Sequence, residues 1–216
     1  MSTALPLEAQ ILERPLHVVM LLYPEVEILD FAGPYEVLSV ATRVALRDRI
    51  CSHAPFTVTT VAARRELVSA RYELRVQPDA DFSDDLPCDI LLVPGGVIDQ
   101  PMADPATLEW VRRMADKTTL LTSVCSGALI LAKAGLLDGQ RVTTHWADIE
   151  ELRHDYPALD VVEDIPYVDA GALVTSAGIS AGIDMTLHLV ARLLGAEAGR
   201  TTARQMQYEW QDVAAA

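Results

Sequence analysis

One cysteine lies where a buried strand is expected to turn directly into a helix. Residues 119–124 are apolar and rich in β-branched side chains, and Cys125-Ser126-Gly127 follows them. Free backbone N–H groups and the positive end of the helix dipole meet at a helix start, and both favour thiolate over thiol. The pattern predicts that Cys125 is a nucleophile at a sharp elbow, with a small buried hydrophobic residue as the alternative.

Two other loops with chemically useful groups follow expected strands. Pro94-Gly95-Gly96 comes directly after the apolar run 89–93, and the acidic stretch that ends at Asp30 follows the first strand. The carboxyl ends of parallel strands lie at the same edge of a sheet. We therefore expect the carboxyl of Asp30 and the glycine loop to lie close to Cys125.

The elements that would position these loops alternate between strands and helices. Such alternation predicts an α/β fold, with a mostly parallel sheet between helices on both faces. A hairpin with Ala170-Gly171 at its turn is expected over 167–175, and a short strand entering a helix over 141–146. The expected strands are 16–23, 56–63, 89–93 and 119–124, and the expected helices are about 34–47, 105–116, 182–194 and 196–211.

Composition restricts the classes of protein and of partner. The chain has 216 residues, half of them hydrophobic, which predicts a single domain over 16–212 behind a flexible leader at 1–15. A formal charge of −14, from 31 acidic and 17 basic residues, disfavours nucleic acid as a partner.

Cysteine and histidine usage argues against disulfides and metals. Three cysteines without paired spacing suit a reducing compartment. The histidines show no metal-ligand spacing with each other or with cysteine, so no metal is expected. The chain has no signal-peptide pattern and no apolar run of the roughly 20 residues that a membrane span needs, which predicts a cytoplasmic protein without membrane contact.

Four motifs in a fixed order carry a family resemblance. They are Pro-Gly-Gly at 94–96, Ser-Val-Cys-Ser-Gly at 123–127, Thr-Thr-His at 143–145 and Leu-Val-Thr-Ser-Ala-Gly at 173–178. On these motifs the chain resembles the DJ-1/PfpI superfamily from about residue 16 to 195. The segment 23–34 resembles the isonitrile hydratase branch, whose acid stands at the position of Asp30.

The resemblance implies a flavodoxin-like three-layer sandwich, a homodimer, a small-molecule substrate and no metal or organic cofactor. One position differs from the relatives. Ser126 stands where isonitrile hydratases have Thr and PfpI-type proteases have His. Serine keeps the hydroxyl but cannot act as the imidazole base of a Cys-His pair, which favours the hydratase over the protease.

Roles for individual residues follow from this resemblance and from their chemistry. Cys125 would be the nucleophile, Asp30 an acid that stays protonated near neutrality, and Ser126 a hydroxyl that assists. Asp30 and Ser126 could instead only cap helices. His145 either contacts the substrate or makes a structural hydrogen bond. We expect the N–H groups of Gly96 and Ser126 to stabilise charge that develops on the intermediate. The residues expected to bind the substrate or this charge are Gly95, Gly96, Gly127 and His145.

Three functions compete. The first is hydration of an isonitrile to an N-substituted formamide through a thioimidate on Cys125. The second is a DJ-1-like glyoxalase or PfpI-like protease or amidase activity on the same thiol. The third is a non-catalytic ligand-sensing domain like those of AraC-type regulators, which would need a partner protein, because the sequence ends soon after Trp210 with no room for helix-turn-helix motifs.

Overall fold

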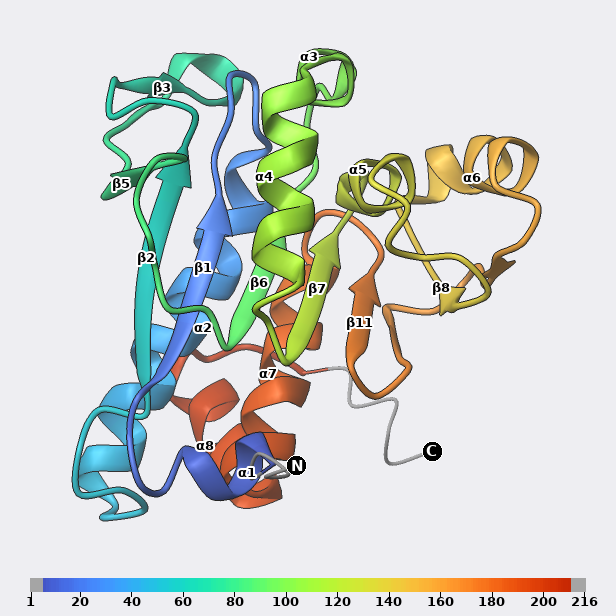
Figure 1. The fold of residues 1–216 in the computed structure, drawn as a ribbon. Helices are drawn as coiled ribbons and strands as arrows, with labels where there is room; N and C mark the ends of the chain where they lie inside the picture. Colours follow the sequence, from blue (N-terminus) through green and yellow to red (C-terminus); the bar gives the residue numbers. More distant parts are fainter. Residues whose placement is uncertain (1–5, 211–216) are drawn as a thin grey trace, which may run out of the picture.

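A seven-stranded sheet forms the centre of the molecule (Figure 1). The computed structural model describes residues 6–210, and its main sheet has the strand order β10-β11-β7-β6-β1-β2-β5. All neighbouring strands pair in parallel, except that β10 and β11 are antiparallel. The strands are β1 (Leu16–Leu21), β2 (Phe56–Ala62), β5 (Ala80–Asp81), β6 (Ile90–Val93), β7 (Leu120–Val124), β10 (Tyr167–Asp169) and β11 (Leu173–Ser176). The four expected strands and the expected hairpin are confirmed.

Helices cover both faces of this sheet. In Figure 1, α4 lies in front of the strands and α2 and α7 lie behind them. One layer contains α1 (Leu7–Gln10), α2 (Ile28–Arg47), α7 (Ala181–Leu194) and α8 (Ala196–Gln205), and the other contains α3 (Asp99–Ala103), α4 (Pro105–Ala115), α5 (Gly127–Lys133) and α6 (Ile149–Asp155). Short elements complete the chain: β3 (Val68–Ser69), η1 (Arg71–Glu73), β4 (Arg75–Val76), β8 (Arg141–Val142), η2 (Trp146–Asp148) and β9 (Asp160–Val161).

Alternation along the central strands creates two hydrophobic cores. In β1, Val18 and Met20 belong to the core shared with α2 and α7, whereas Val19 and Leu21 belong to the core shared with α4 and α5. Successive side chains of a strand point to opposite faces, so a strand buried on both faces must be apolar throughout. This arrangement confirms the α/β three-layer sandwich with a mostly parallel, flavodoxin-like sheet.

The helix that carries Asp30 begins earlier than expected. The sequence predicted a start near Pro34, but α2 begins at Ile28 and contains Pro34. Glu27 is its N-cap residue, and the Glu27 carboxylate accepts a hydrogen bond from the Ile28 N–H at 3.2 Å. Asp30 therefore lies in the first helical turn, buried, and not in a loop ahead of the helix.

Both ends of the described chain pack against the body. A loose leader was expected for residues 1–15, but this expectation is wrong for 6–15, because Leu7 and Ile11 are buried in the core beside α7. The last helix ends at Gln205 rather than 211, and the Tyr208 hydroxyl donates to the Asp184 carboxylate at 3.0 Å. Residues 1–5 and 211–216, and with them the expected boundary at 212, lie outside the described residues.

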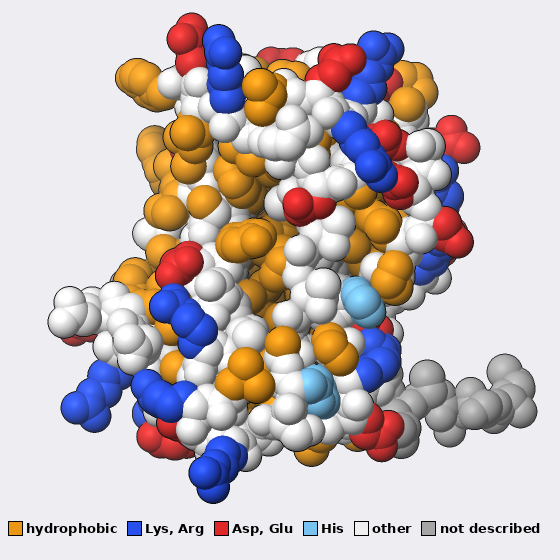
Figure 2. All heavy atoms as spheres, turned by 90° about the vertical axis from the view of Figure 1, so that its left-hand side faces the viewer, with side chains coloured by type: hydrophobic (Ala, Val, Ile, Leu, Met, Phe, Trp, Pro, Cys, Tyr) orange, Lys and Arg blue, Asp and Glu red, His pale blue; other side chains and the backbone are white. Residues whose placement is uncertain are grey.

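The β2 edge of the sheet is partly closed by a side chain. Because β5 pairs only with Val61 and Ala62, the first half of β2 has no strand beyond it among the described residues. The Asp79 carboxylate accepts hydrogen bonds from the Thr60 N–H and hydroxyl at 2.9 and 2.7 Å. Figure 2 shows this side of the molecule, where apolar side chains gather in a hollow that includes Tyr35. The carboxylate blocks one point at which another strand could pair.

Within residues 6–210, no helix is both long enough and apolar enough to span a bilayer.

Candidate active site

Three loops meet at the carboxyl edge of adjacent strands. The order β7-β6-β1 places the segment after each strand next to the others. Cys125 follows β7, Gly95 and Gly96 follow β6, and Asp30 lies just beyond the loop after β1. The structure therefore brings together the residues that the sequence selected from distant parts of the chain.

The turn at Cys125 is sharp and held from two sides. Cys125 has a φ of 58°, an uncommon value for a residue with a side chain. Its N–H donates to the Ser176 carbonyl at 3.1 Å, and its carbonyl accepts from the Thr144 hydroxyl at 2.9 Å. A Cβ on Gly127 would lie 2.1 Å from the Val93 carbonyl oxygen, so the helix can start this close to β6 only with glycine there.

Asp30 is completely buried beside the thiol. Its Oδ2 accepts a hydrogen bond from the Gly95 N–H at 3.0 Å. Its Oδ1 has no hydrogen-bond partner within the described part of the chain, and the Cys125 thiol is close enough to the same carboxyl group to influence its pKa. One oxygen is thus fixed by the glycine loop, and the other is available to hold a proton near the sulfur.

Burial changes the acidity of this carboxyl. Loss of hydration raises the pKa of Asp30 from 3.8 to about 7, and the negative charge of Glu27 adds to the rise. The Gly95 N–H and the Cys125 thiol act in the opposite direction because they hydrogen-bond to the ionised form. A substantial fraction of Asp30 therefore carries a proton at neutral pH, as the sequence led us to expect.

The thiol differs from the expectation. Burial raises the pKa of Cys125, the charge of Asp30 raises it further, and the hydrogen bond from the Ser126 N–H lowers it only in part. The helix start alone had suggested a lowered pKa, but Cys125 is only 7% exposed, and the charge of Asp148 also opposes its ionisation. Cys125 and Asp30 consequently keep at least one proton between them at neutral pH.

The Ser126 side chain hydrogen-bonds to the glycine loop and does not cap the start of α5. Its hydroxyl accepts the Gly96 N–H at 3.1 Å and lies 3.3 Å from the Gly96 carbonyl, to which it donates, and it makes no side-chain capping bond. The Gly96 N–H is therefore occupied, contrary to its expected role as a free donor to the substrate. The Ser126 N–H points to the sulfur instead, as its effect on the thiol pKa indicates.

His145 forms part of the wall next to the sulfur. Its Nδ1 accepts the Ala147 N–H at 3.3 Å, which orients the ring at the start of η2. A Cβ on Gly178 would lie 2.6 Å from both the His145 Cδ2 and the Cys125 Sγ, so ring and sulfur flank the same glycine. The His145 ring makes no hydrogen bond to the Cys125 sulfur. Its position is compatible with both roles expected for it, which are contact with the substrate and a structural hydrogen bond.

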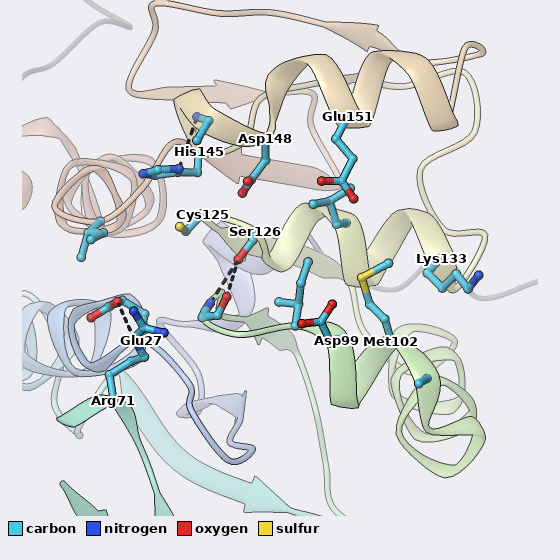
Figure 3. Close-up of a pocket in the computed structure, with 16 residues that line it drawn as sticks. Glu27, Arg71, Asp99, Met102, Cys125, Ser126, Lys133, His145, Asp148 and Glu151 are labelled. Carbon is cyan, nitrogen blue, oxygen red and sulfur yellow. Dashed lines mark hydrogen bonds and ion pairs between the residues drawn. The ribbon is translucent and has the colours of Figure 1, made fainter. Parts of the chain in front are cut away.

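A pocket of about 650 Å³ opens above these residues (Figure 3). Cys125 and Ser126 lie at its base, between η2 and α6 on one side and α3 on the other. No sequence motif marked most of the wall, because its residues come from segments far apart in the chain. The lining residues are Glu27, Arg71, Gly96, Ile98, Asp99, Met102, Ala103, Cys125, Ser126, Leu129, Lys133, His145, Ala147, Asp148, Glu151 and Ile179.

Metal binding gains no support from this arrangement. Within residues 6–210, no group of three or more His, Cys, Asp or Glu side chains is placed to hold an ion. The expectation of a cofactor-independent site stays a prediction.

Gly95→Ala is expected to disrupt the site without unfolding the protein. The added Cβ would lie 2.5 Å from the Ser126 Oγ, 2.7 Å from its nitrogen and 2.9 Å from the Asp30 Oδ2. Overpacking of this kind costs about 1–3 kcal/mol, so thermal unfolding should show a folded but less stable protein. We expect the alkylation rate of Cys125 to change at least about fivefold, since a few tenths of an ångström at Asp30 alter its interaction with the thiol. An unchanged rate and stability would contradict the close packing of this loop.

Asp30→Asn is expected to change how stability depends on pH. The folded pKa of Asp30, about 7, exceeds its ordinary value of 3.8, so the unfolded chain loses this proton first. The group therefore lowers the free energy of unfolding as pH rises from about 4 to 7, by on the order of 4 kcal/mol. Chemical denaturation at several pH values should show Asp30→Asn gaining stability relative to wild type across that window. Parallel curves would show that Asp30 titrates normally.

Known proteins resemble this chain in sequence over most of its length. The DJ-1/PfpI family profile matches residues 16–192. Isonitrile hydratase from Pseudomonas putida is 36% identical over 194 residues, which cover 89% of this chain and 78% of that protein. The HTH-type transcriptional regulator CdhR from Pseudomonas aeruginosa is 32% identical over 176 residues, or 81% of this chain and half of the regulator.

A solved structure agrees with these sequence matches. A ThiJ/PfpI family protein from Pseudomonas syringae superposes with a TM-score of 0.79 at 26% identity, covering 93% of this chain and 78% of that one. The family profile spans β1 to α7 and so includes the elbow, the glycine loop and the segment that carries Asp30. The chain therefore belongs to the DJ-1/PfpI family.

Proposed function

We propose that this protein is a cofactor-independent cysteine enzyme that hydrates isonitriles to N-substituted formamides. The observation that carries the proposal is the buried carboxyl of Asp30, with its raised pKa, beside Cys125, which lines the pocket. The 36% identity to an isonitrile hydratase supports the same substrate class.

The first step needs a nucleophile and a proton donor at one atom. The terminal carbon of an isonitrile, R–N≡C, accepts a thiolate and a proton. Ionised Asp30 would take the proton of the Cys125 thiol and donate it to that carbon while the sulfur bonds to the same carbon, giving a thioimidate, R–N=CH–S–Cys, and leaving Asp30 ionised again. The raised pKa of Asp30 suits it to this role, because a carboxyl at its ordinary value would hold almost no proton at neutral pH.

The second step returns the enzyme to its starting state. Asp30, now ionised, would take a proton from a water molecule that adds to the thioimidate carbon. The hydroxyl proton of this adduct moves to its nitrogen, and collapse breaks the C–S bond and releases R–NH–CHO. The expelled thiolate regains its proton from Asp30, so that the net change is the addition of one water. The Ser126 N–H stabilises the departing sulfur anion, because it hydrogen-bonds to the thiolate form.

The competing activities on the same thiol have weaker support. A protease or amidase of the PfpI type needs an imidazole that takes the proton from the cysteine. Ser126 occupies that position, and the His145 Nδ1 is engaged by the Ala147 N–H. Methylglyoxal consumption without isonitrile turnover would favour a glyoxalase instead.

A ligand-sensing role is the second candidate. The similarity to CdhR covers half of that regulator, and burial raises the pKa of Cys125, as it would for an unreactive thiol. A sensor would bind its ligand with similar affinity after Cys125→Ser, whereas an enzyme would lose turnover. The homodimer and the cytoplasmic location also remain predictions, which sedimentation and cell fractionation would test.

Incubation with a simple isonitrile tests the proposed function directly. Cyclohexyl isonitrile should be converted to N-cyclohexylformamide, detected by mass spectrometry, with incorporation of one oxygen from ¹⁸O-labelled water. If the wild-type protein forms no formamide from aliphatic or aromatic isonitriles, the substrate assignment is wrong.

A further inference from the structure

The pocket above Cys125 carries an excess of negative charge. Glu27 and Arg71 form an ion pair at 3.8 Å on one side of it. The other charged side chains that line it are Asp99, Asp148 and Glu151, against a single cation, Lys133. In Figure 3, Asp148 and Glu151 extend toward the space above Ser126, whereas the Lys133 amine points away at the far end.

These three carboxylates have no lysine or arginine partner within the described residues. Across residues 6–210, no ion pair includes Asp99, Asp148 or Glu151, although Glu150, an exposed carboxylate next to Glu151 on α6, is paired with Arg153 at 2.8 Å. Asp148 is half-buried, and loss of hydration raises its pKa although the nearby His145 acts in the opposite direction. An unpaired carboxylate in such a position interacts favourably with a cation.

The charge lies close to the reacting atom. The carboxylate of Asp148 is near enough to Cys125 that its charge helps to raise the thiol pKa. Apolar side chains of Ile98, Met102 and Leu129 line the same pocket and can contact methylene groups. A molecule with its reactive carbon at the sulfur would thus have its substituent in the space between these apolar side chains and the carboxylates of Asp148 and Glu151.

We propose that the preferred isonitrile carries a positive charge on its substituent, such as a protonated amine or a quaternary ammonium group, which is bound by Asp148 and Glu151. This inference rests on the proposed hydratase function for the identity of the reactive group. The cation would also offset the negative charge that Asp30, Asp148 and the sulfur bring together during addition.

A pair of isonitriles of equal shape tests the preference. In 2-(trimethylammonio)ethyl isonitrile and 3,3-dimethylbutyl isonitrile, a quaternary nitrogen in one replaces a quaternary carbon in the other. At an ionic strength of about 0.01 M, where charges are weakly screened, we expect kcat/KM to be at least about tenfold higher for the cation. Equal values, or a preference for the neutral compound, would overturn the inference and leave the hydratase function intact.

A matched pair of double variants locates the effect. Asp148→Asn with Glu151→Gln should reduce the ratio of the two kcat/KM values to near one. Glu150→Gln with Asp155→Asn alters net charge by the same amount on the same segment, but neither residue lines the pocket, so the ratio should stay at its wild-type value. An equal fall in both variants would show a general field effect and contradict binding by Asp148 and Glu151.

Thiol labelling provides a readout that does not depend on isonitrile turnover. Cys125 should react faster with 2-(trimethylammonium)ethyl methanethiosulfonate than with the anionic 2-sulfonatoethyl reagent, each rate divided by that of a free thiol. We expect a ratio of at least about ten at low salt, falling with added salt and in the Asp148→Asn, Glu151→Gln protein. If no isonitrile is hydrated but this ratio is found, the hydratase function fails and the cation preference stands; a ratio of one or less would overturn it.

Discussion

Cys125→Ala is expected to abolish formamide production, with turnover falling to the rate of the solution without protein. Every step of the proposed reaction passes through a bond to this sulfur, and alanine removes the nucleophile without filling the space. The loss should be at least about 10³-fold in kcat/KM, measured as formamide formed from cyclohexyl isonitrile. Binding should persist, because the pocket wall is unchanged, so a fluorescence or calorimetric titration would still detect the substrate.

Cys51→Ala is the matched control for this variant. Cys51 is also buried, lies outside the pocket and contacts the Ile11 carbonyl with its sulfur at 3.9 Å. Its removal should lower stability by about 1–2 kcal/mol while kcat/KM stays within about twofold of wild type. Residual turnover in Cys125→Ala, or an equal loss in Cys51→Ala, would rule out the assigned nucleophile.

Asp30→Asn is expected to separate reactivity of the thiol from turnover. The charge of Asp30 raises the pKa of Cys125, so its removal should lower the pH at which the thiol is alkylated. Asparagine cannot protonate the isonitrile carbon, so kcat/KM should fall by about 10²–10⁴-fold even though the sulfur ionises more readily. Alkylation by iodoacetamide and formamide production, each measured against pH, would show the two changes in opposite directions.

The wild-type pH profile provides the companion measurement. The pKa of Asp30 is near 7 and that of the Cys125 thiol is raised above it, so the pair changes from two protons to the single proton that the reaction uses as pH rises through about 7, and kcat/KM should increase over that range. Asp138→Asn, at an exposed carboxyl after α5, should keep the wild-type profile. Full turnover in Asp30→Asn would exclude Asp30 as the proton donor.

The sequence determined which loops lie at one edge of the sheet because strands and their ends can be inferred locally. Apolar runs of strand length, each followed by a glycine, an acid or a cysteine, imply loops that share one edge of a parallel sheet. This reasoning correctly brought Asp30 and Gly95 to Cys125, since β1, β6 and β7 are adjacent. The raised pKa of Asp30 was predicted from the family resemblance and from the expected burial of this carboxyl beside the sulfur, and the structure agrees with it.

Helix boundaries and hydrogen-bond partners depended on contacts that no local pattern contains. The amphipathic pattern suggested that this helix begins near residue 34, but α2 begins at Ile28 with Glu27 as its N-cap. The Pro-Gly-Gly motif suggested that the Gly96 N–H would be free to bind the substrate. In the folded chain, the Ser126 hydroxyl accepts a hydrogen bond from it.

The acidity of the thiol and the charge of the pocket were decided by tertiary structure alone. A helix start favours thiolate, but burial of Cys125 and the charges of Asp30 and Asp148 outweigh it. Asp148 and Glu151 lie on the adjoining η2 and α6, whereas Asp99 lies on α3, and no local pattern indicates that these segments face one space. Electrostatic energies depend on distance and on exclusion of water, and both arise only when these segments pack together.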